Sequence, residues 1–116
     1  MIPFEKLTYP TDGTRIEVDE SGNLVVPPDP VIPFIEGDGV GPDVSKAAKA
    51  VMDAAVSRAY GDTKRIAWLS VHAGLSALEI YGNDTVLPDD TVEAIRHFHV
   101  AIKGPLTTPV GGFAYV

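Results

Sequence analysis

One strand-turn-helix segment constrains the fold more than any other part of the chain. The run 31–35 (VIPFI) is apolar and bounded by turn residues, which is typical of a strand that is covered on both faces. The glycine-rich stretch 36–41 permits a tight turn, and Pro42 suits the first position of a helix. Apolar residues at three- and four-residue steps then predict a helix over 42–60, which Gly61 would end.

The rest of the chain continues this alternation of strands and helices. Strands are expected at 65–71 and 100–102, and helices at 75–81 and 88–98. Strands that alternate with helices predict a parallel sheet with right-handed crossovers. The predicted fold class is therefore α/β, with a β-hairpin followed by a parallel β-α-β-α-β unit.

The chain before this unit predicts an irregular arm and a hairpin. Residues 1–13 show no periodicity, so we expect an arm there and a domain over 14–116. Short β-favouring runs at 15–18 and 24–26 have alternating apolar residues, which predict a hairpin with one buried face. Pro33 removes one ladder donor, which predicts an edge position or a bulge in its strand.

Composition narrows the class of protein. A chain of 116 residues allows one domain at most, and the net charge of -7 argues against a surface for nucleic acid or an anionic membrane. No apolar run reaches the ~18 residues that a membrane span needs. The first residues lack the features of a signal peptide and there is no cysteine, so we expect a cytoplasmic protein.

Two loops lie where ligands bind in α/β proteins, beyond the carboxyl ends of predicted strands. The first, 37–41, reads G-x-G-x-G and not the G-x-G-x-x-G of a dinucleotide fingerprint. An anion could bind at the helix start that follows, although Glu36 and Asp38 would repel phosphate. The alternative is a sharp turn that needs glycine backbones.

The second loop, 103–108, carries the side chains best suited to a ligand. Lys103 could hold a carboxylate or a phosphate as a point charge. Thr107 and Thr108 could donate hydroxyl hydrogen bonds to the same ligand. The alternative is an exposed lysine in a polar turn.

Residue spacing supports neither a metal site nor a catalytic triad. His97 and His99 lie two apart at a helix end and point to different sides, and His72 belongs to a separate element. The acidic pair 89–90 occupies a helix start, where carboxylates complement the helix dipole. Phe98 is expected to be a core aromatic.

The turn 35–41 (IEGDGVG) and the stretch 103–112 (KGPLTTPVGG) are the most distinctive segments of the chain. With them, the chain from about Thr14 to Gly112 closely resembles the N-terminal part of the bacterial NADP-dependent isocitrate dehydrogenases. The turn is shared by the decarboxylating β-hydroxyacid dehydrogenases, whereas the uninterrupted second stretch points to the isocitrate enzymes. The resemblance implies the N-terminal part of the large domain of the isocitrate/isopropylmalate dehydrogenase fold.

The resemblance also implies an activity, cofactors and partners. Enzymes of this family oxidise isocitrate with NADP and decarboxylate the product to 2-oxoglutarate with Mg²⁺ or Mn²⁺, as cytoplasmic homodimers. By the resemblance, Thr107 contacts NADP near its nicotinamide end, and Lys103, Leu106 and Thr108 are its neighbours. The turn 36–41 would shape the floor of the cleft.

The chain departs from the family pattern after Gly112. There the family continues with a glycine and I-R-S-L-N, whose serine, asparagine and arginine hold isocitrate, whereas residues 113–116 read FAYV. The family's catalytic tyrosine and lysine and its metal-binding aspartates have no counterpart here, so we assign no catalytic or metal-ligating residue. Two hypotheses stay open: an isocitrate dehydrogenase sequence that is incomplete as given, and a non-catalytic α/β interaction module derived from that enzyme.

Overall fold

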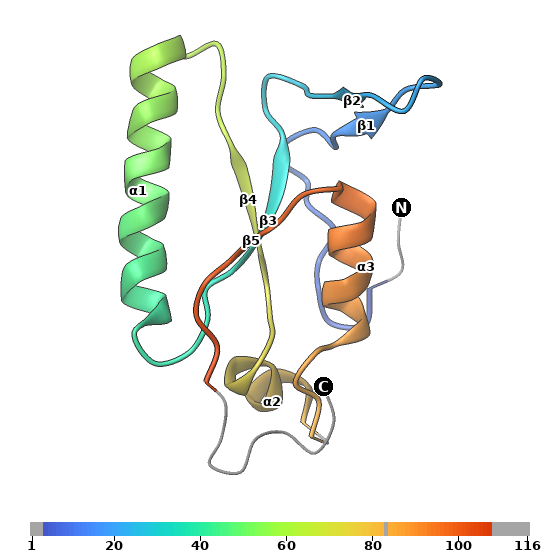
Figure 1. Cartoon of the computed structure of the whole chain (residues 1–116), viewed down its shortest axis with the longest axis vertical. Helices are drawn as coiled ribbons and strands as arrows, with labels where there is room; N and C mark the ends of the chain where they lie inside the picture. Colours follow the sequence, from blue (N-terminus) through green and yellow to red (C-terminus); the bar gives the residue numbers. More distant parts are fainter. Residues whose placement is uncertain (1–3, 83, 108–116) are drawn as a thin grey trace.

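The computed structural model describes residues 4–82 and 84–107, and its elements follow the predicted order (Figure 1). They are β1 (Glu17–Val18), β2 (Leu24–Val25), β3 (Val31–Ile35), α1 (Gly41–Tyr60), β4 (Ala67–Val71), α2 (Leu75–Tyr81), α3 (Asp89–Phe98) and β5 (Ile102–Lys103). Strands β1 and β2 form an antiparallel hairpin. Strands β4, β3 and β5 form a parallel sheet in that order, which confirms the α/β fold class.

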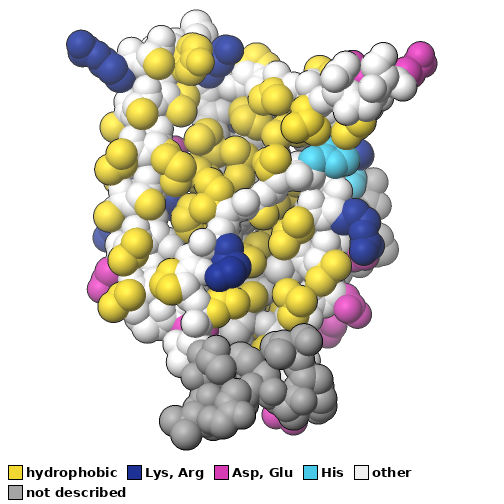
Figure 2. Space-filling view, viewed as in Figure 1, with side chains coloured by type: hydrophobic (Ala, Val, Ile, Leu, Met, Phe, Trp, Pro, Cys, Tyr) yellow, Lys and Arg dark blue, Asp and Glu magenta, His cyan; other side chains and the backbone are white. Residues whose placement is uncertain are grey.

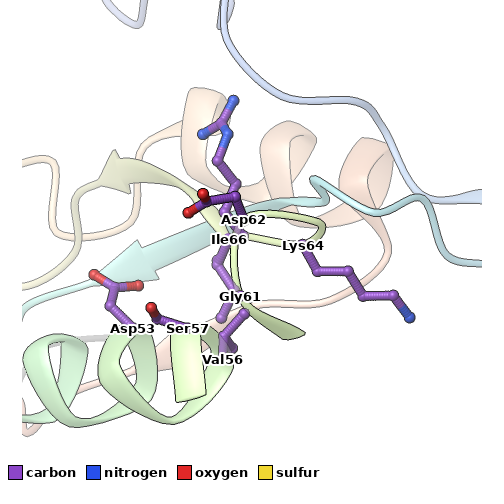
Figure 3. Close-up of a pocket in the computed structure, with 8 residues that line it drawn as sticks. Asp53, Val56, Ser57, Gly61, Asp62, Lys64 and Ile66 are labelled. Atoms are coloured by element: carbon purple, nitrogen blue, oxygen red, sulfur yellow. The ribbon is translucent and has the colours of Figure 1, made fainter. Parts of the chain in front are cut away.

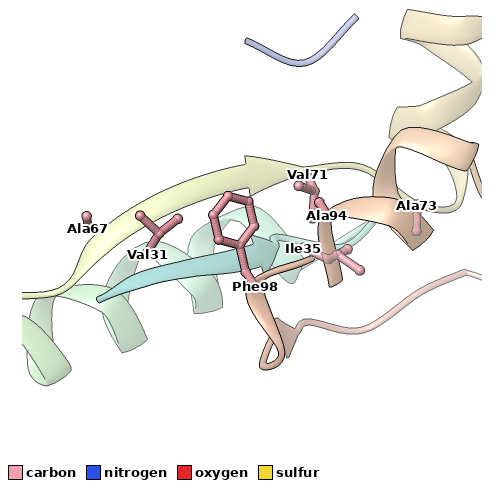
Figure 4. Packing of buried hydrophobic residues seen from close by; sticks show 7 residues of the cluster. All are labelled: Val31, Ile35, Ala67, Val71, Ala73, Ala94 and Phe98. Carbon is pink, nitrogen blue, oxygen red and sulfur yellow. The ribbon is translucent and has the colours of Figure 1, made fainter. Parts of the chain in front are cut away.

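The parallel sheet separates two helical layers. Figure 1 shows α1 along one side of the sheet and α3 along the other, with α2 beyond the carboxyl ends of the strands. On the α3 side, Ala94 and Phe98 lie against Val31 and Ile35 of β3 and form the centre of the core (Figure 4). Phe98 is 1% exposed, so it is the core aromatic that its position predicted. Its burial stabilises the fold by roughly 1.5–3 kcal/mol.

Pro33 lies in the central strand of the sheet, so the expectation of an edge or a bulge is wrong. Backbone N–H groups of successive residues in a strand point to opposite neighbours, so position 33 faces the same side as Val31. The N–H of Val31 donates to the carbonyl of Thr14, which precedes the hairpin. Strand β5 pairs only with Phe34 and Ile35 of β3. Pro33 therefore removes no hydrogen bond that the described strands would make.

The hairpin has no buried face, which corrects the prediction from its alternating pattern. Among its residues Ile16 is buried, whereas Val18, Leu24 and Val25 are about half exposed. The hairpin pairs with itself alone and extends away from the parallel sheet (Figure 1). None of the described elements therefore covers the side chains of Val18, Leu24 and Val25.

Helix α1 also leaves apolar residues in solvent. Val44 and Val51 are 55% and 69% exposed, while Gly41 and Ser45, near the turn from β3, are buried. Figure 2 shows further apolar side chains gathered across the face between α1 and α3. The helix thus contacts the sheet along a narrow stripe only. Within the described ranges, none of the helices has the length and hydropathy that crossing a membrane requires.

Candidate functional site

The two loops that the sequence singles out meet at the carboxyl ends of β3 and β5. The N–H of Asp38 donates to the carbonyl of Pro105 at 2.8 Å, and the N–H of Gly104 donates to the carbonyl of Ile35 at 2.7 Å. Because β3 and β5 are parallel neighbours, the loops that follow them leave the sheet at the same end, the carboxyl end of the strands. We call this contact of turn 36–41 with loop 103–107 the strand-end junction.

Glycine is required where the two loops cross. A Cβ on Gly104 would collide with the carbonyl of Glu36, and a Cβ on Gly37 would collide with the carbonyl of Pro105. Gly37 also has a φ of +93°, a left-handed conformation that favours glycine. These contacts support the interpretation of 37–41 as a sharp turn in which glycine permits close backbone approach.

Asp38 joins the junction to helix α2. Its side chain is buried at 7% exposure, and its carboxylate accepts backbone N–H groups from Leu75 at 3.1 Å, Ser76 at 3.3 Å and Thr107 at 3.1 Å. The sequence predicts a carboxylate that repels phosphate at the helix start, but the side chain of Asp38 points inward to backbone donors. No periodicity links position 38 to position 107, so the contact had no signal in the sequence.

Glu36, the other carboxylate of the turn, is exposed and pairs with a cation. Its side chain lies 3.7 Å from the Lys49 ammonium group, which also lies 4.6 Å above the ring of Phe34. This pair partly neutralises the charge at the edge of the junction. Solvent screening limits the contribution of such a pair to about 0–1 kcal/mol.

A hollow of about 280 Å³ opens beside the junction, between the ends of β3 and β4 and helix α2. Burial lowers the pKa of His72 in its wall, and the nearby Glu36 carboxylate acts in the opposite direction. In residues 4–82 and 84–107, no group of three or more histidine, aspartate or glutamate side chains is arranged to hold a metal ion. The polar lining residues are Glu36, Ser70, His72, Ser76 and Glu79.

The predicted ligand residues lie on the exposed side of the junction. Lys103, Leu106 and Thr107 are all exposed, and the Lys103 ammonium donates to the carbonyl of Gly104 at 2.9 Å. The structure thus brings these three residues together on one loop and holds the last of them through its backbone. Thr108, the fourth predicted ligand residue, lies outside the described residues.

A second hollow, of about 370 Å³, lies at the other end of α1 (Figure 3). Its lining includes Asp53 and Ser57 of α1 and Arg65 before β4. A hydrogen bond and the charge of Asp12 raise the pKa of Arg65. Because this hollow lies near the amino end of β4, it is separate from the strand-end junction.

The fold and the junction define an α/β protein in which turn 36–41 and loop 103–107 follow adjacent parallel strands. Residues 31–113 match the family described as isocitrate/isopropylmalate dehydrogenase. The chain belongs to that family, and the resemblance seen in the sequence is confirmed.

Individual relatives agree with this assignment. The chain is 50% identical over 109 residues to isocitrate dehydrogenase (NADP) of Pseudomonas aeruginosa, a match that covers 94% of this chain and 26% of the relative. The enzyme of the same name from Nostoc sp. is 51% identical over 109 residues, covering 94% and 23%. The crystal structure of isocitrate dehydrogenase from Methylococcus capsulatus superimposes with a TM-score of 0.58 at 38% identity, over 75% of this chain and 23% of that one. The chain thus spans about a quarter of the length of these relatives.

Proposed function

We propose that this chain is the N-terminal part of an NADP-dependent isocitrate dehydrogenase, and that loop 103–108 contacts the nicotinamide end of NADP. One observation carries the assignment of the loop. The side chains of Lys103, Leu106 and Thr107 are exposed. The backbone of the loop is fixed by hydrogen bonds to Asp38 at Pro105 and at Thr107. A loop that is fixed on one side and open on the other is suited to present side chains to a ligand.

Each exposed residue has a distinct part in this proposal. Thr107 offers a hydroxyl that hydrogen-bonds the cofactor, and Leu106 offers apolar surface beside it. Lys103 offers a positive point charge for a carboxylate or a phosphate. Because Asp38 already orders the backbone of Thr107, binding costs less conformational entropy than it would on a mobile loop.

The proposed reaction of the whole protein is the oxidation of isocitrate by NADP, followed by decarboxylation to 2-oxoglutarate. Bound NADP would accept the hydride. The described residues do not fit a divalent metal, since they hold no cluster of suitable ligands, so we assign no step to Mg²⁺ or Mn²⁺ in this segment. The metal, the homodimer and the cytoplasmic location belong to the proposal for the whole protein.

A chimeric enzyme tests the role of the loop. This chain replaces the matching quarter of the Pseudomonas aeruginosa relative, and NADP reduction is measured with isocitrate and Mn²⁺. We expect Thr107→Ala to raise the KM for NADP about tenfold, the effect of one lost hydrogen bond of about 1.4 kcal/mol. Thr8→Ala, a matched change at an exposed residue of the arm, should leave that KM unchanged. Equal KM values for the two variants would contradict the proposal.

A second candidate function, an interaction module without catalysis, is favoured by the exposed apolar residues. Val44 and Val51 of α1 and Leu24 of the hairpin are all at least half exposed. Such side chains gather at surfaces that bind other proteins. Size-exclusion chromatography of the 116-residue chain mixed with the full-length Pseudomonas aeruginosa enzyme separates the two candidates, because only an interaction module would co-elute with it.

A further inference from the structure

The carboxylate of Asp38 couples helix α2 to the proposed cofactor loop. Its Oδ2 atom accepts the N–H of Leu75 and the N–H of Thr107, each at 3.1 Å, while Oδ1 accepts the N–H of Ser76 at 3.3 Å. One oxygen therefore bonds to two segments that lie far apart in the sequence. The position of Thr107 relative to α2 depends on this atom.

The contact uses a buried charge, which is costly unless hydrogen bonds compensate it. Asp38 belongs to none of the ion pairs among the described residues, and the partners of its carboxylate are backbone N–H groups. Hydrogen bonds to an ionised acceptor are about twice as strong as neutral ones. A carboxylate at this position therefore holds the loop more firmly than a neutral side chain of the same size.

Gly74 leaves room for this carboxylate. A Cβ at Gly74 would collide with Oδ2 of Asp38 and would approach Cδ2 of Leu106 at 3.1 Å. Gly74 also has a φ of +74°. Because Gly74 has no side chain, the carboxylate of Asp38 fits beside it and reaches the N–H of Thr107.

We propose that Asp38 is a positioning residue for the cofactor, which fixes the backbone of Thr107 so that its hydroxyl faces the nicotinamide end of NADP. This inference rests on the proposed function of loop 103–108. Asp38 itself touches no substrate, and it acts through Thr107. Asp38, in the turn after β3, thereby positions the ligand contact that Thr107 makes in the loop after β5.

Amide hydrogen exchange on the ¹⁵N-labelled 116-residue chain tests the positioning directly. In Asp38→Asn an amide group replaces one acceptor oxygen, so at least one N–H loses its partner. We expect exchange to accelerate by at least about tenfold at each N–H that loses its partner, the factor for one lost charge-assisted bond. The N–H groups among Thr107, Leu75 and Ser76 that keep a partner should exchange faster by a smaller factor, because their bond is now to a neutral oxygen. The N–H of Gly104 bonds to Ile35 and not to Asp38, so its exchange should not change. Asp43→Asn, at an exposed carboxylate nearby, is the matched control.

The outcomes separate this inference from the proposed function. In the chimeric enzyme, Asp38→Asn should raise the KM for NADP by about the factor seen with Thr107→Ala, about tenfold, while Asp38→Glu should restore part of the loss. If Thr107→Ala raises the KM and Asp38→Asn does not, the role of Asp38 is overturned and the proposed function stands. If Asp38→Asn accelerates exchange but Thr107→Ala leaves the KM unchanged, the proposed function fails. If the variant does not fold, the wild-type chain decides: exchange at Thr107 as fast as in an unstructured peptide overturns the inference, and slowed exchange supports it.

Discussion

The hydroxyl of Tyr81 donates a hydrogen bond of 2.7 Å to the carboxylate of Asp90. The same carboxylate accepts backbone N–H groups from Glu5 at 2.7 Å, Lys6 at 2.8 Å and Leu7 at 3.2 Å. One buried side chain at the start of α3 thus ties the N-terminal arm and the end of α2 to the core.

Asp90→Asn should destabilise the chain by about 2–4 kcal/mol, because a buried cluster of donors loses its ionised acceptor. Asp90 is 6% exposed, whereas its neighbour Asp89 is exposed. Urea unfolding followed by circular dichroism measures the free energy of unfolding for Asp90→Asn and for the control, Asp89→Asn. Equal values for the two variants would show that the arm is not held by Asp90.

The contribution of Asp90 should depend on pH. Burial by itself raises the pKa of this carboxyl, but hydrogen bonds from the backbone of Lys6 and Glu5, from Tyr81 and from Leu7 outweigh burial and lower the pKa. The folded pKa lies below the unfolded value of about 3.9, so the stabilisation is present above about pH 4 and is lost as the pH falls through the folded pKa. The difference in unfolding free energy between wild type and Asp90→Asn should be constant from about pH 7 to about pH 5 and shrink below about pH 4. A difference that persists unchanged in acid contradicts this assignment.

Gly104→Ala should disrupt the strand-end junction, since its Cβ would collide with the backbone carbonyl of Glu36. We expect a loss of about 2–3 kcal/mol of stability, as for overpacking against atoms that cannot move aside. Gly22→Ala is the control: its Cβ meets no atom within 4 Å, although its φ of +84° adds a backbone cost of about 1 kcal/mol. Thermal unfolding compares the two variants, and a larger loss for Gly22→Ala would refute the close approach at the junction.

The exposed apolar face of α1 should make the 116-residue chain self-associate. Val51 and Val44 present apolar surface to water, and such surface favours association. We expect Val51→Lys to reduce the apparent mass in sedimentation at equilibrium, whereas Ala50→Lys on another side of the helix should not. A wild-type chain that sediments as a monomer at every concentration would contradict this prediction.

The 116-residue chain by itself should not reduce NADP in the presence of isocitrate and Mn²⁺. Catalysis requires contacts that strengthen in the transition state, and the described residues hold no group of three or more side chains arranged to bind the metal ion. The assay follows NADPH absorbance, with the full-length Pseudomonas aeruginosa enzyme as the positive control. Turnover above background that disappears in Thr107→Ala would prove the prediction wrong.

Local patterns determined the order and type of the elements. The apolar run 31–35, the glycine-rich turn and the helical spacing after Pro42 each act over a few residues, and the structure contains β3 and α1 at nearly the expected bounds. The family resemblance likewise rested on contiguous residues, 35–41 and 103–112. Such signals are legible in one sequence because backbone preference and side-chain period are set by near neighbours.

Contacts between distant residues were decided only by the tertiary structure. The local sequence predicted an edge position or a bulge at Pro33, yet Pro33 lies in the central strand. It fits there because β5 starts to pair at Phe34, so no N–H is needed at position 33. The local sequence indicated that Asp38 is a turn residue and that Asp90 is a helix-start residue. In the structure each carboxylate is buried and accepts backbone N–H groups from segments remote in the sequence. Val44 had the spacing of a buried position, and the fold left it in solvent. Burial and hydrogen-bond partners depend on which segments the chain brings together, and that information does not reside in any local window of the sequence.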